Sequence, residues 1–186
     1  MIIHISGSPG SGKTTIGKKL KQHFKSKVVV KDLDDLFSEY MESNTTKFNP
    51  KKYQKYIDNF IETNHKKPII LVGLNQEHLT KTLYDVYADH KFFINLPTEI
   101  NLRRHFDREF DNWLDWMENR DHTILFNQLL DDEKEVINGL TNSLKRALAI
   151  SKQEKFITSF YKIYEKEEYE FMTDKQIFNK VLKLIK

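Results

Sequence analysis

Residues 7–14 hold the residue types with the clearest chemical meaning in this chain. They read Gly-Ser-Pro-Gly-Ser-Gly-Lys-Thr and fit the spacing G-x-x-x-x-G-K-S/T. Residues 2–5 before them are mostly apolar, and Ile16, Leu20 and Phe24 after them recur at helical intervals. Glycines allow the backbone to approach an anion closely, so successive N–H groups can converge on it at the start of a helix. The pattern therefore predicts a loop that binds the phosphates of a nucleoside triphosphate.

The loop residues have distinct expected roles in nucleotide binding. Lys13 is expected to reach the β- and γ-phosphates, and the hydroxyl of Thr14 is expected to ligate Mg²⁺. The full predicted binding set is Gly7, Ser8, Pro9, Gly10, Ser11, Gly12, Lys13, Thr14 and Thr15. The nucleotide is ATP or GTP, since the sequence does not distinguish the two bases. The alternative, a Gly- and Ser-rich strand-to-helix turn that binds nothing, does not explain why every position of the motif fits.

Three aspartates, Asp32, Asp34 and Asp35, follow the next apolar stretch at residues 28–30. If the chain stays extended here, alternation turns Asp32 and Asp34 to the same side. One carboxylate could then hold the metal ion or its waters, while the other accepts a proton from a substrate hydroxyl. Alternatively, these acids cap a helix that begins near Leu33, because Asp is a favoured N-cap residue. Capping and catalysis can coexist.

The elements that must position these residues alternate along the chain. Apolar stretches predict parallel strands at residues 2–6, 27–31, 68–72 and 91–96. Helical patterns fill residues 33–67, with a break near 49–50, and most of 100–150. Thr173 and Gln176 form a capping-box pattern before a closing helix. The alternation predicts a doubly wound α/β sheet whose ligands bind at the carboxyl ends of the strands.

Composition limits the class of protein. The 186 residues, 39% hydrophobic and 31% charged, predict one globular domain. No apolar run approaches the roughly 20 residues that cross a bilayer, so we expect no membrane association, no export signal and a cytoplasmic location. Without cysteine there is no disulfide or thiolate metal site. The seven histidines lack metal-ligand spacing and are expected in loops or on the surface, and a net charge of +3 does not require an extended nucleic-acid interface.

The order of these features resembles the small P-loop kinases, a group that contains shikimate kinase, gluconate kinase, nucleoside-monophosphate kinases and 5′-polynucleotide kinases. The matching positions are residues 7–15, Asp32, Asp34, Gly73 and residues 96–99, followed by Arg104 and Arg108. The resemblance implies a single domain over residues 1–186 with a three-layer α/β/α P-loop NTPase fold, a mostly parallel sheet and a helical lid. It implies a helical acceptor-binding insertion at residues 33–67 and the lid at residues 103–121.

The resemblance also implies chemical roles for the aspartates and the loop lysine. Asp32 would organise Mg²⁺, and Asp34 would orient or deprotonate the attacking hydroxyl, with Asp35 as the competing candidate. Lys13 and Mg²⁺ would stabilise the charge that develops during phosphoryl transfer. The third apolar stretch continues to Asn75 without a carboxylate, whereas most P-loop proteins that hydrolyse nucleotides for work place a metal-organising Asp after a later strand.

The lid arginines are expected on one helix over residues 103–120. Its apolar face consists of Phe106, Phe110, Trp113, Leu114 and Met117. Arg104 and Arg108 project from the opposite side, and similar kinases use such arginines to neutralise charge on the transferred phosphoryl group. The alternative is surface pairing of the two arginines with Asp107 and Asp111 at i,i+3.

The acceptor site has fewer markers in the sequence. No arginine precedes Arg103, whereas similar kinases usually hold anionic acceptors with arginine. Either the acceptor is neutral there, as a nucleoside or polyol would be, or lysines replace the arginines, namely Lys47, Lys51, Lys52 and Lys55. Aromatic residues could line an acceptor pocket, although their spacing is more typical of a core: Tyr40, Phe48, Tyr53 and Tyr56.

These features predict a kinase that moves the γ-phosphoryl group of ATP or GTP, with Mg²⁺, to a small-molecule acceptor such as a nucleoside, a nucleotide or another hydroxyl metabolite. One alternative is a nucleotide-binding NTPase module that recruits a partner and turns over slowly without any metabolite. Another is a kinase for the 5′-hydroxyl ends of nucleic acid, which needs a basic groove and a salt-dependent affinity. Nucleic acid is the less favoured partner, and the oligomeric state is not predicted.

Overall fold

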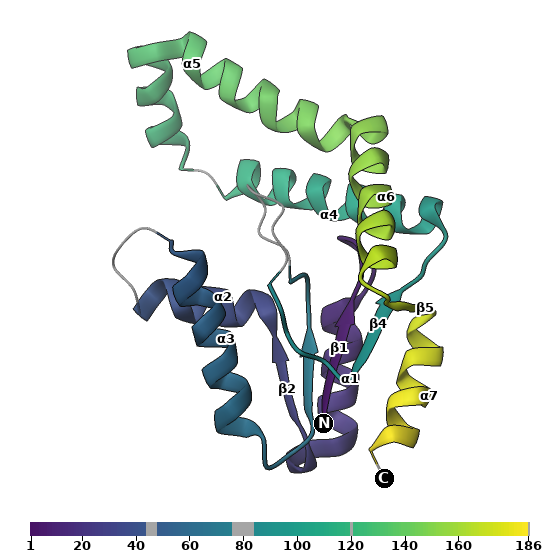
Figure 1. Ribbon diagram of the computed structural model, residues 1–186. Helices are drawn as coiled ribbons and strands as arrows, with labels where there is room; N and C mark the ends of the chain where they lie inside the picture. Colours follow the sequence, from purple (N-terminus) through teal and green to yellow (C-terminus); the bar gives the residue numbers. More distant parts are fainter. Residues whose placement is uncertain (44–47, 76–83, 120, 186) are drawn as a thin grey trace. The chain divides into compact units, whose positions relative to one another are not determined.

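Strands and helices alternate along the chain, as the apolar pattern predicts. The computed structural model describes residues 1–43, 48–75, 84–119 and 121–185 (Figure 1). The strands are β1 (Ile2–Ser6), β2 (Val29–Asp32), β3 (Ile69–Val72), β4 (His90–Ile94) and β5 (Glu170–Met172). The helices are α1 (Lys13–Phe24), α2 (Leu33–Ser43), α3 (Pro50–Asn64), α4 (Thr98–Glu118), α5 (His122–Leu148), α6 (Ile150–Lys166) and α7 (Asp174–Leu184).

The chain divides into two compact units. The sheet unit comprises residues 1–96 and 160–186, and the helical unit comprises residues 97–159. The helical unit contains α4, α5 and the first part of α6. Where the chain leaves the sheet unit and returns to it, the hydroxyl of Tyr161 donates to the Leu96 carbonyl over 3.0 Å and accepts from the Leu96 N–H over 3.4 Å. The single domain over residues 1–186 stays a prediction.

The strands of the sheet unit run parallel in the order β2-β3-β1-β4-β5 (Figure 1). β1 lies in the centre, where Ile5 pairs with Val72 of β3 and with Phe92 of β4. Asp32, the last residue of β2, pairs with Val72 as well. Because parallel strands end at the same edge of a sheet, the loops after β1, β2 and β3 lie next to one another. The predicted parallel α/β sheet is confirmed.

Both faces of the sheet carry apolar side chains, so helices cover both. On one face, α1 and α7 pack on β1, β3 and β4 through Ile16, Leu20, Ile177 and Val181. On the other face, α2 and α3 pack on β3 through Leu33, Leu36, Tyr53 and Ile57, and the end of α6 packs on Phe93 through Phe160 and Tyr164. Along β3, Ile70 and Val72 face α1 while Ile69 and Leu71 face the opposite layer. The predicted three-layer α/β/α arrangement is therefore confirmed.

Element boundaries differ from the sequence prediction in ways that have local causes. β2 begins at Val29 because Lys25–Lys27 form a 3₁₀ turn after α1. The predicted break between two helices is confirmed at Pro50, where the Asn49 side chain accepts a hydrogen bond from the Lys52 N–H over 3.1 Å. β5 was not predicted, because a strand of three residues within a charged segment is too short to show an alternating or apolar pattern.

Candidate nucleotide-binding site

The phosphate loop connects the end of β1 to the start of α1 at the carboxyl edge of the sheet. Gly10 and Gly12 have φ angles of 81° and 96°, and Gly12 directly precedes α1. Glycine adopts this left-handed backbone without a steric penalty. The Ser11 N–H donates to the Ser8 carbonyl over 3.1 Å, which curls the loop at the positive end of a 12-residue helix. This geometry suits an anion such as a phosphate.

Gly7, the first residue of the motif, has no room for a side chain. A Cβ atom here would lie 2.4 Å from Ser11 Oγ and 3.2 Å from Ile94 Cβ. Ser11 itself is 2% exposed, and its hydroxyl makes no hydrogen bond to any residue that the structure describes. The loop is therefore packed tightly at its base, and a side chain at position 7 would force Ser11 to shift.

Lys13 bends back over the phosphate loop. Its Nζ atom donates to the carbonyl of Gly7 over 2.8 Å and to the carbonyl of Ser8 over 3.0 Å. The ammonium group therefore lies beside the loop backbone to which the sequence pattern assigns the phosphates. Its predicted contact with the β- and γ-phosphates stays a prediction.

Thr14 and Asp32 meet although 17 residues separate them in the chain. The Thr14 hydroxyl donates to Asp32 Oδ2 over 3.0 Å, so the first turn of α1 touches the end of β2. A hydroxyl and a carboxylate are oxygen ligands of the kind that Mg²⁺ prefers, and Mg²⁺ usually takes one or two protein carboxylates together with phosphates and waters. In the described part of the chain, no group of three or more His, Asp and Glu side chains could hold a metal by itself. The pair fits a nucleotide-bound Mg²⁺.

Asp34 is placed differently from the extended segment that the sequence suggested. α2 begins at Leu33, so Asp34 and Asp35 lie in the first turn of a helix and are both exposed. Asp32 caps that helix, because its Oδ1 accepts from the Asp34 N–H over 3.1 Å. The capping interpretation thus holds for Asp32, whose other oxygen contacts Thr14. Alternation along a strand does not relate Asp32 to Asp34.

Gly73 forms the wall of the site behind Asp32. Its φ angle is 128°, and a Cβ atom here would lie 3.1 Å from both Asp32 Oδ1 and Leu33 Cβ. His4 Nε2 donates to the Gly73 carbonyl over 3.0 Å, and the Tyr169 hydroxyl donates to His4 Nδ1 over 2.5 Å. Because a carbonyl can only accept, this pairing fixes the proton of the neutral imidazole on Nε2. His4 therefore holds the turn that lies against the Asp32 carboxylate.

His4 corrects the expectation that the histidines lie in loops or on the surface. Its side chain is completely buried in the central strand, and burial lowers its pKa to about 4. His105 is also buried, at 8% exposure. A signal for His4 exists in the sequence, since it stands between Ile3 and Ile5 in a strand that a parallel sheet buries on both faces.

The two candidate lid arginines lie on α4 in the helical unit, and both are exposed. Arg108 donates to His105 Nδ1 over 2.9 Å and to Glu109 Oε1 over 3.4 Å. Asp107 pairs with Arg103 at 3.0 Å. The observed pairs therefore differ from the predicted i,i+3 pairs, and the role of Arg104 and Arg108 in phosphoryl transfer stays a prediction.

The aromatic residues proposed for an acceptor pocket belong mainly to the core. Tyr40 and Tyr53 are each 3% exposed and pack between α2, α3 and the sheet, with Phe48 and Tyr56 partly buried against them. This confirms the core interpretation. Three of the candidate lysines are exposed on α3, namely Lys51, Lys52 and Lys55, whereas Lys47 lies outside the described residues.

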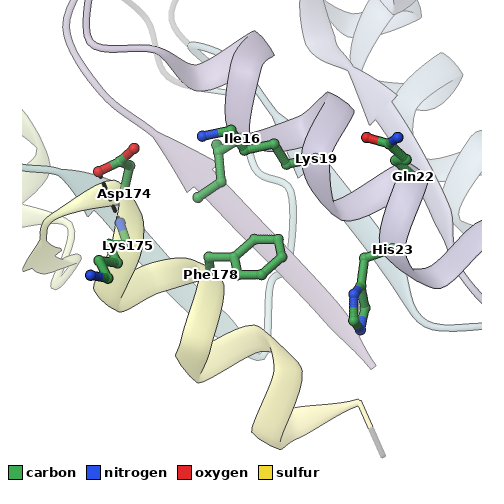
Figure 2. Close-up of a pocket in the computed structure, with 7 residues that line it drawn as sticks. All are labelled: Ile16, Lys19, Gln22, His23, Asp174, Lys175 and Phe178. Carbon is green, nitrogen blue, oxygen red and sulfur yellow. Dashed lines mark hydrogen bonds between the residues drawn. The ribbon is translucent and has the colours of Figure 1, made fainter.

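A groove runs between α1 and α7 within the sheet unit (Figure 2). Its volume is about 620 Å³, and it is lined by Ile16, Lys19, Gln22, His23, Asp174, Lys175 and Phe178. Ile16 and Phe178 supply its apolar surface, as Figure 2 shows. Ile16 follows Thr14 by two residues on the same helix, so the groove begins close to the phosphate loop.

Comparison with solved structures finds remote similarities. The crystal structure of a protein named APE1195 is 18% identical with a TM-score of 0.40, and the match covers 76% of each chain. The crystal structure of a gluconokinase from Sinorhizobium meliloti 1021 is 14% identical with a TM-score of 0.35, and the match covers 86% of this chain and 94% of the gluconokinase. A comparison with curated proteins finds no match. Among the described helices, none is long and apolar enough to cross a membrane.

The parallel sheet and the phosphate loop at its carboxyl edge define a P-loop nucleotide-binding protein. A family model described as an AAA domain (AAA_18) matches residues 3–126, which is more than half of the chain. The chain therefore belongs to this AAA domain family.

Proposed function

We propose that this protein is a phosphotransferase that moves the γ-phosphoryl group of ATP or GTP to a small-molecule acceptor. The observation that carries the proposal is the 3.0 Å contact between the Thr14 hydroxyl and the Asp32 carboxylate, next to the loop that Lys13 covers. It brings the candidate magnesium ligands to the phosphate loop from two different elements. Asp34, two residues beyond Asp32, then supplies a second, exposed carboxylate close to the same edge.

The residues of the site divide the chemistry among them. The loop N–H groups and Lys13 would hold the phosphates, and Thr14 and Asp32 would hold Mg²⁺, which neutralises phosphate charge when bound. Asp34 would accept the proton of the acceptor hydroxyl. The acceptor oxygen forms a bond to the γ-phosphorus while the bond from that phosphorus to the β,γ-bridging oxygen breaks, and the nucleoside diphosphate leaves.

We propose further roles for the lid and the insertion. Arg104 and Arg108 would neutralise charge on the transferred group, as arginines do in phosphoryl transfer. The acceptor would bind over residues 33–67. The exposed lysines of α3 support an acceptor with an anionic group, whereas a neutral polyol or nucleoside would not need them. Both classes are therefore tested.

Consumption of ATP and GTP with a panel of acceptors tests the proposal. The panel contains nucleosides, nucleotides, sugars and short 5′-hydroxyl oligonucleotides, and the Lys13→Ala variant serves as the blank. We expect one class of small molecule to accelerate nucleotide consumption. Slow turnover that no acceptor accelerates would instead indicate a nucleotide-binding module, and acceleration by oligonucleotides that falls steeply with salt would indicate a polynucleotide kinase.

Asp34→Asn tests the proton acceptor. Because loss of a general base typically costs about 10²- to 10⁴-fold in rate, we expect at least a hundredfold slower transfer with an unchanged affinity for the magnesium nucleotide. Asp35→Asn is the matched control, since Asp35 has the same charge and lies in the same exposed turn. If Asp35→Asn loses transfer and Asp34→Asn keeps it, the role belongs to Asp35.

A further inference from the structure

We propose that the helical unit carries a second binding site, separate from the phosphate loop, for a small organic anion that bears a carboxylate or a phosphate group. The site is a cavity of about 690 Å³ among α4, α5 and α6. It is lined by His105, Glu109, Asn142, Lys145, Ala149, Lys152, Gln153 and Phe156, all of which belong to the helical unit. Typical sites for small molecules measure about 300 to 1,000 Å³.

The charges around this cavity favour an anion. Its one acidic lining residue, Glu109, already contacts the guanidinium of Arg108 at 3.4 Å. Lys145 and Lys152 are exposed at the rim, and neither forms an ion pair with any side chain that the structure describes. Two ammonium charges are therefore available to a ligand, while the carboxylate is compensated within its own helix.

Neutral donors and an aromatic ring complete the lining. The Arg108 guanidinium can only donate, so its 2.9 Å contact with His105 Nδ1 leaves the imidazole proton on Nε2. Burial, together with Arg108, lowers the pKa of His105 and keeps the ring neutral at pH 7. Phe156 is 43% exposed and lies 6.4 Å from the His105 ring between centroids, which gives the cavity an apolar wall. The side-chain amides of Asn142 and Gln153 also line the cavity.

This combination selects the class of ligand. Two lysines and a neutral imidazole N–H match the oxygens of a carboxylate or phosphate, and the aromatic wall matches a carbon skeleton. An inorganic ion would make no apolar contact with Phe156. The proposal does not depend on the proposed phosphotransferase activity, because all of its residues lie outside the sheet unit.

Calorimetric titration of the full chain tests the site with two probes, citrate for carboxylates and glycerol 3-phosphate for phosphates. The titrations are made with the Lys13→Ala variant, because this substitution weakens binding of the probe at the phosphate loop. Binding at the second site can then be measured separately. We expect saturable binding of one probe, and Lys145→Ala/Lys152→Ala should weaken it at least tenfold. The choice between probes identifies the anionic group.

The matched control is Lys19→Ala/Lys175→Ala, which removes the same two charges from the groove between α1 and α7. We expect it to leave probe affinity unchanged within twofold. His105→Phe, which keeps a ring beside Phe156 but removes the N–H, should also weaken binding while circular dichroism shows the same helix content. Absence of saturable binding for both probes, or equal weakening by the two double variants, would overturn the proposal.

Discussion

At the scale of single residues, Asp32 serves two partners with its two carboxylate oxygens. One oxygen caps α2 through the Asp34 N–H, and the other accepts from the Thr14 hydroxyl. The two functions can be separated by substitution, because Asn caps a helix about as well as Asp but carries no charge. Position 32 therefore allows a test of metal binding that leaves the fold intact.

We expect Asp32→Asn to lose most of the magnesium-dependent nucleotide affinity while its free energy of unfolding changes by less than about 0.5 kcal/mol. Asp32→Ala should lose the cap as well, at a cost of about 1 kcal/mol. Calorimetry with and without Mg²⁺ and urea unfolding measure the two effects. Unchanged magnesium dependence in Asp32→Asn would remove this residue from the proposed metal site.

Gly7 and Gly139 offer a matched pair of glycine substitutions. We expect Gly7→Ala to weaken nucleotide binding at least tenfold, because its Cβ would lie 2.4 Å from Ser11 Oγ and force the loop to shift. At Gly139, inside α5, a Cβ would meet nothing within 4 Å. Gly139→Ala should raise the free energy of unfolding by up to about 1 kcal/mol, the difference in helix propensity, and leave nucleotide binding unchanged. Isothermal titration and urea unfolding of both variants check this contrast.

At the scale of elements, α7 is fixed by a cap that the sequence predicted. The Thr173 side chain accepts from the Gln176 N–H over 3.3 Å, and the Gln176 side chain accepts from the Thr173 N–H over 2.9 Å. Ile177 and Val181 of the same helix are buried against the sheet. The reciprocal cap therefore stabilises one of the two helices that cover this face.

We expect Thr173→Ala to lower the free energy of unfolding by about 1 kcal/mol, the usual cost of losing an N-cap. Thr173→Ser keeps the hydroxyl, and because Ser caps a helix at least as well as Thr, we expect the free energy of unfolding to stay within about 0.3 kcal/mol of the wild type. Urea unfolding followed by circular dichroism measures both. Equal losses in the two variants would show that the methyl group of Thr173, and not its hydroxyl, contributes the stability.

The elements also show what the sequence could predict. The phosphate loop, the parallel strands around it and the break before Pro50 follow from short-range patterns, namely glycine spacing, apolar runs and capping residues. Asp34 was wrongly expected in an extended segment. α2 begins at Leu33, directly after β2 ends at Asp32, and the alternation of side chains along a strand does not indicate where the strand ends. His4 was misjudged although residues 2–6 were predicted as a strand of a parallel sheet, because its burial had to be inferred from the flanking strands β3 and β4, which lie far away in sequence.

At the scale of the whole molecule, His4 connects the central strand to distant parts of the sheet unit. It contacts Gly73 after β3 and Tyr169 before β5. The burial that lowers its pKa from 6.5 to about 4 makes folding pH-dependent. As the pH falls below 6.5, the unfolded chain takes up a proton at His4 that the folded chain accepts only near pH 4.

We expect this linkage to lower the free energy of unfolding by up to about 3 kcal/mol between pH 6.5 and pH 4. Above pH 6.5 its contribution to stability is fully present. His4→Gln keeps a hydrogen-bond donor but does not titrate, so its pH dependence in this range should be shallower than that of the wild type. Urea unfolding at several pH values compares the two proteins, and parallel curves would contradict the assignment to His4.

The paired hydrogen bonds between Tyr161 and Leu96 have a consequence for how this chain can vary. They join the chain where it leaves the sheet unit to the chain where it returns. The 63 residues from Pro97 to Ser159 therefore form an insertion in the sheet unit. We expect insertions and deletions within residues 97–159 to leave the register of the strands unchanged, because all strands belong to the sheet unit. We therefore expect differences in length and sequence among related proteins to be concentrated in the helical unit, while the sheet unit with the phosphate loop varies less.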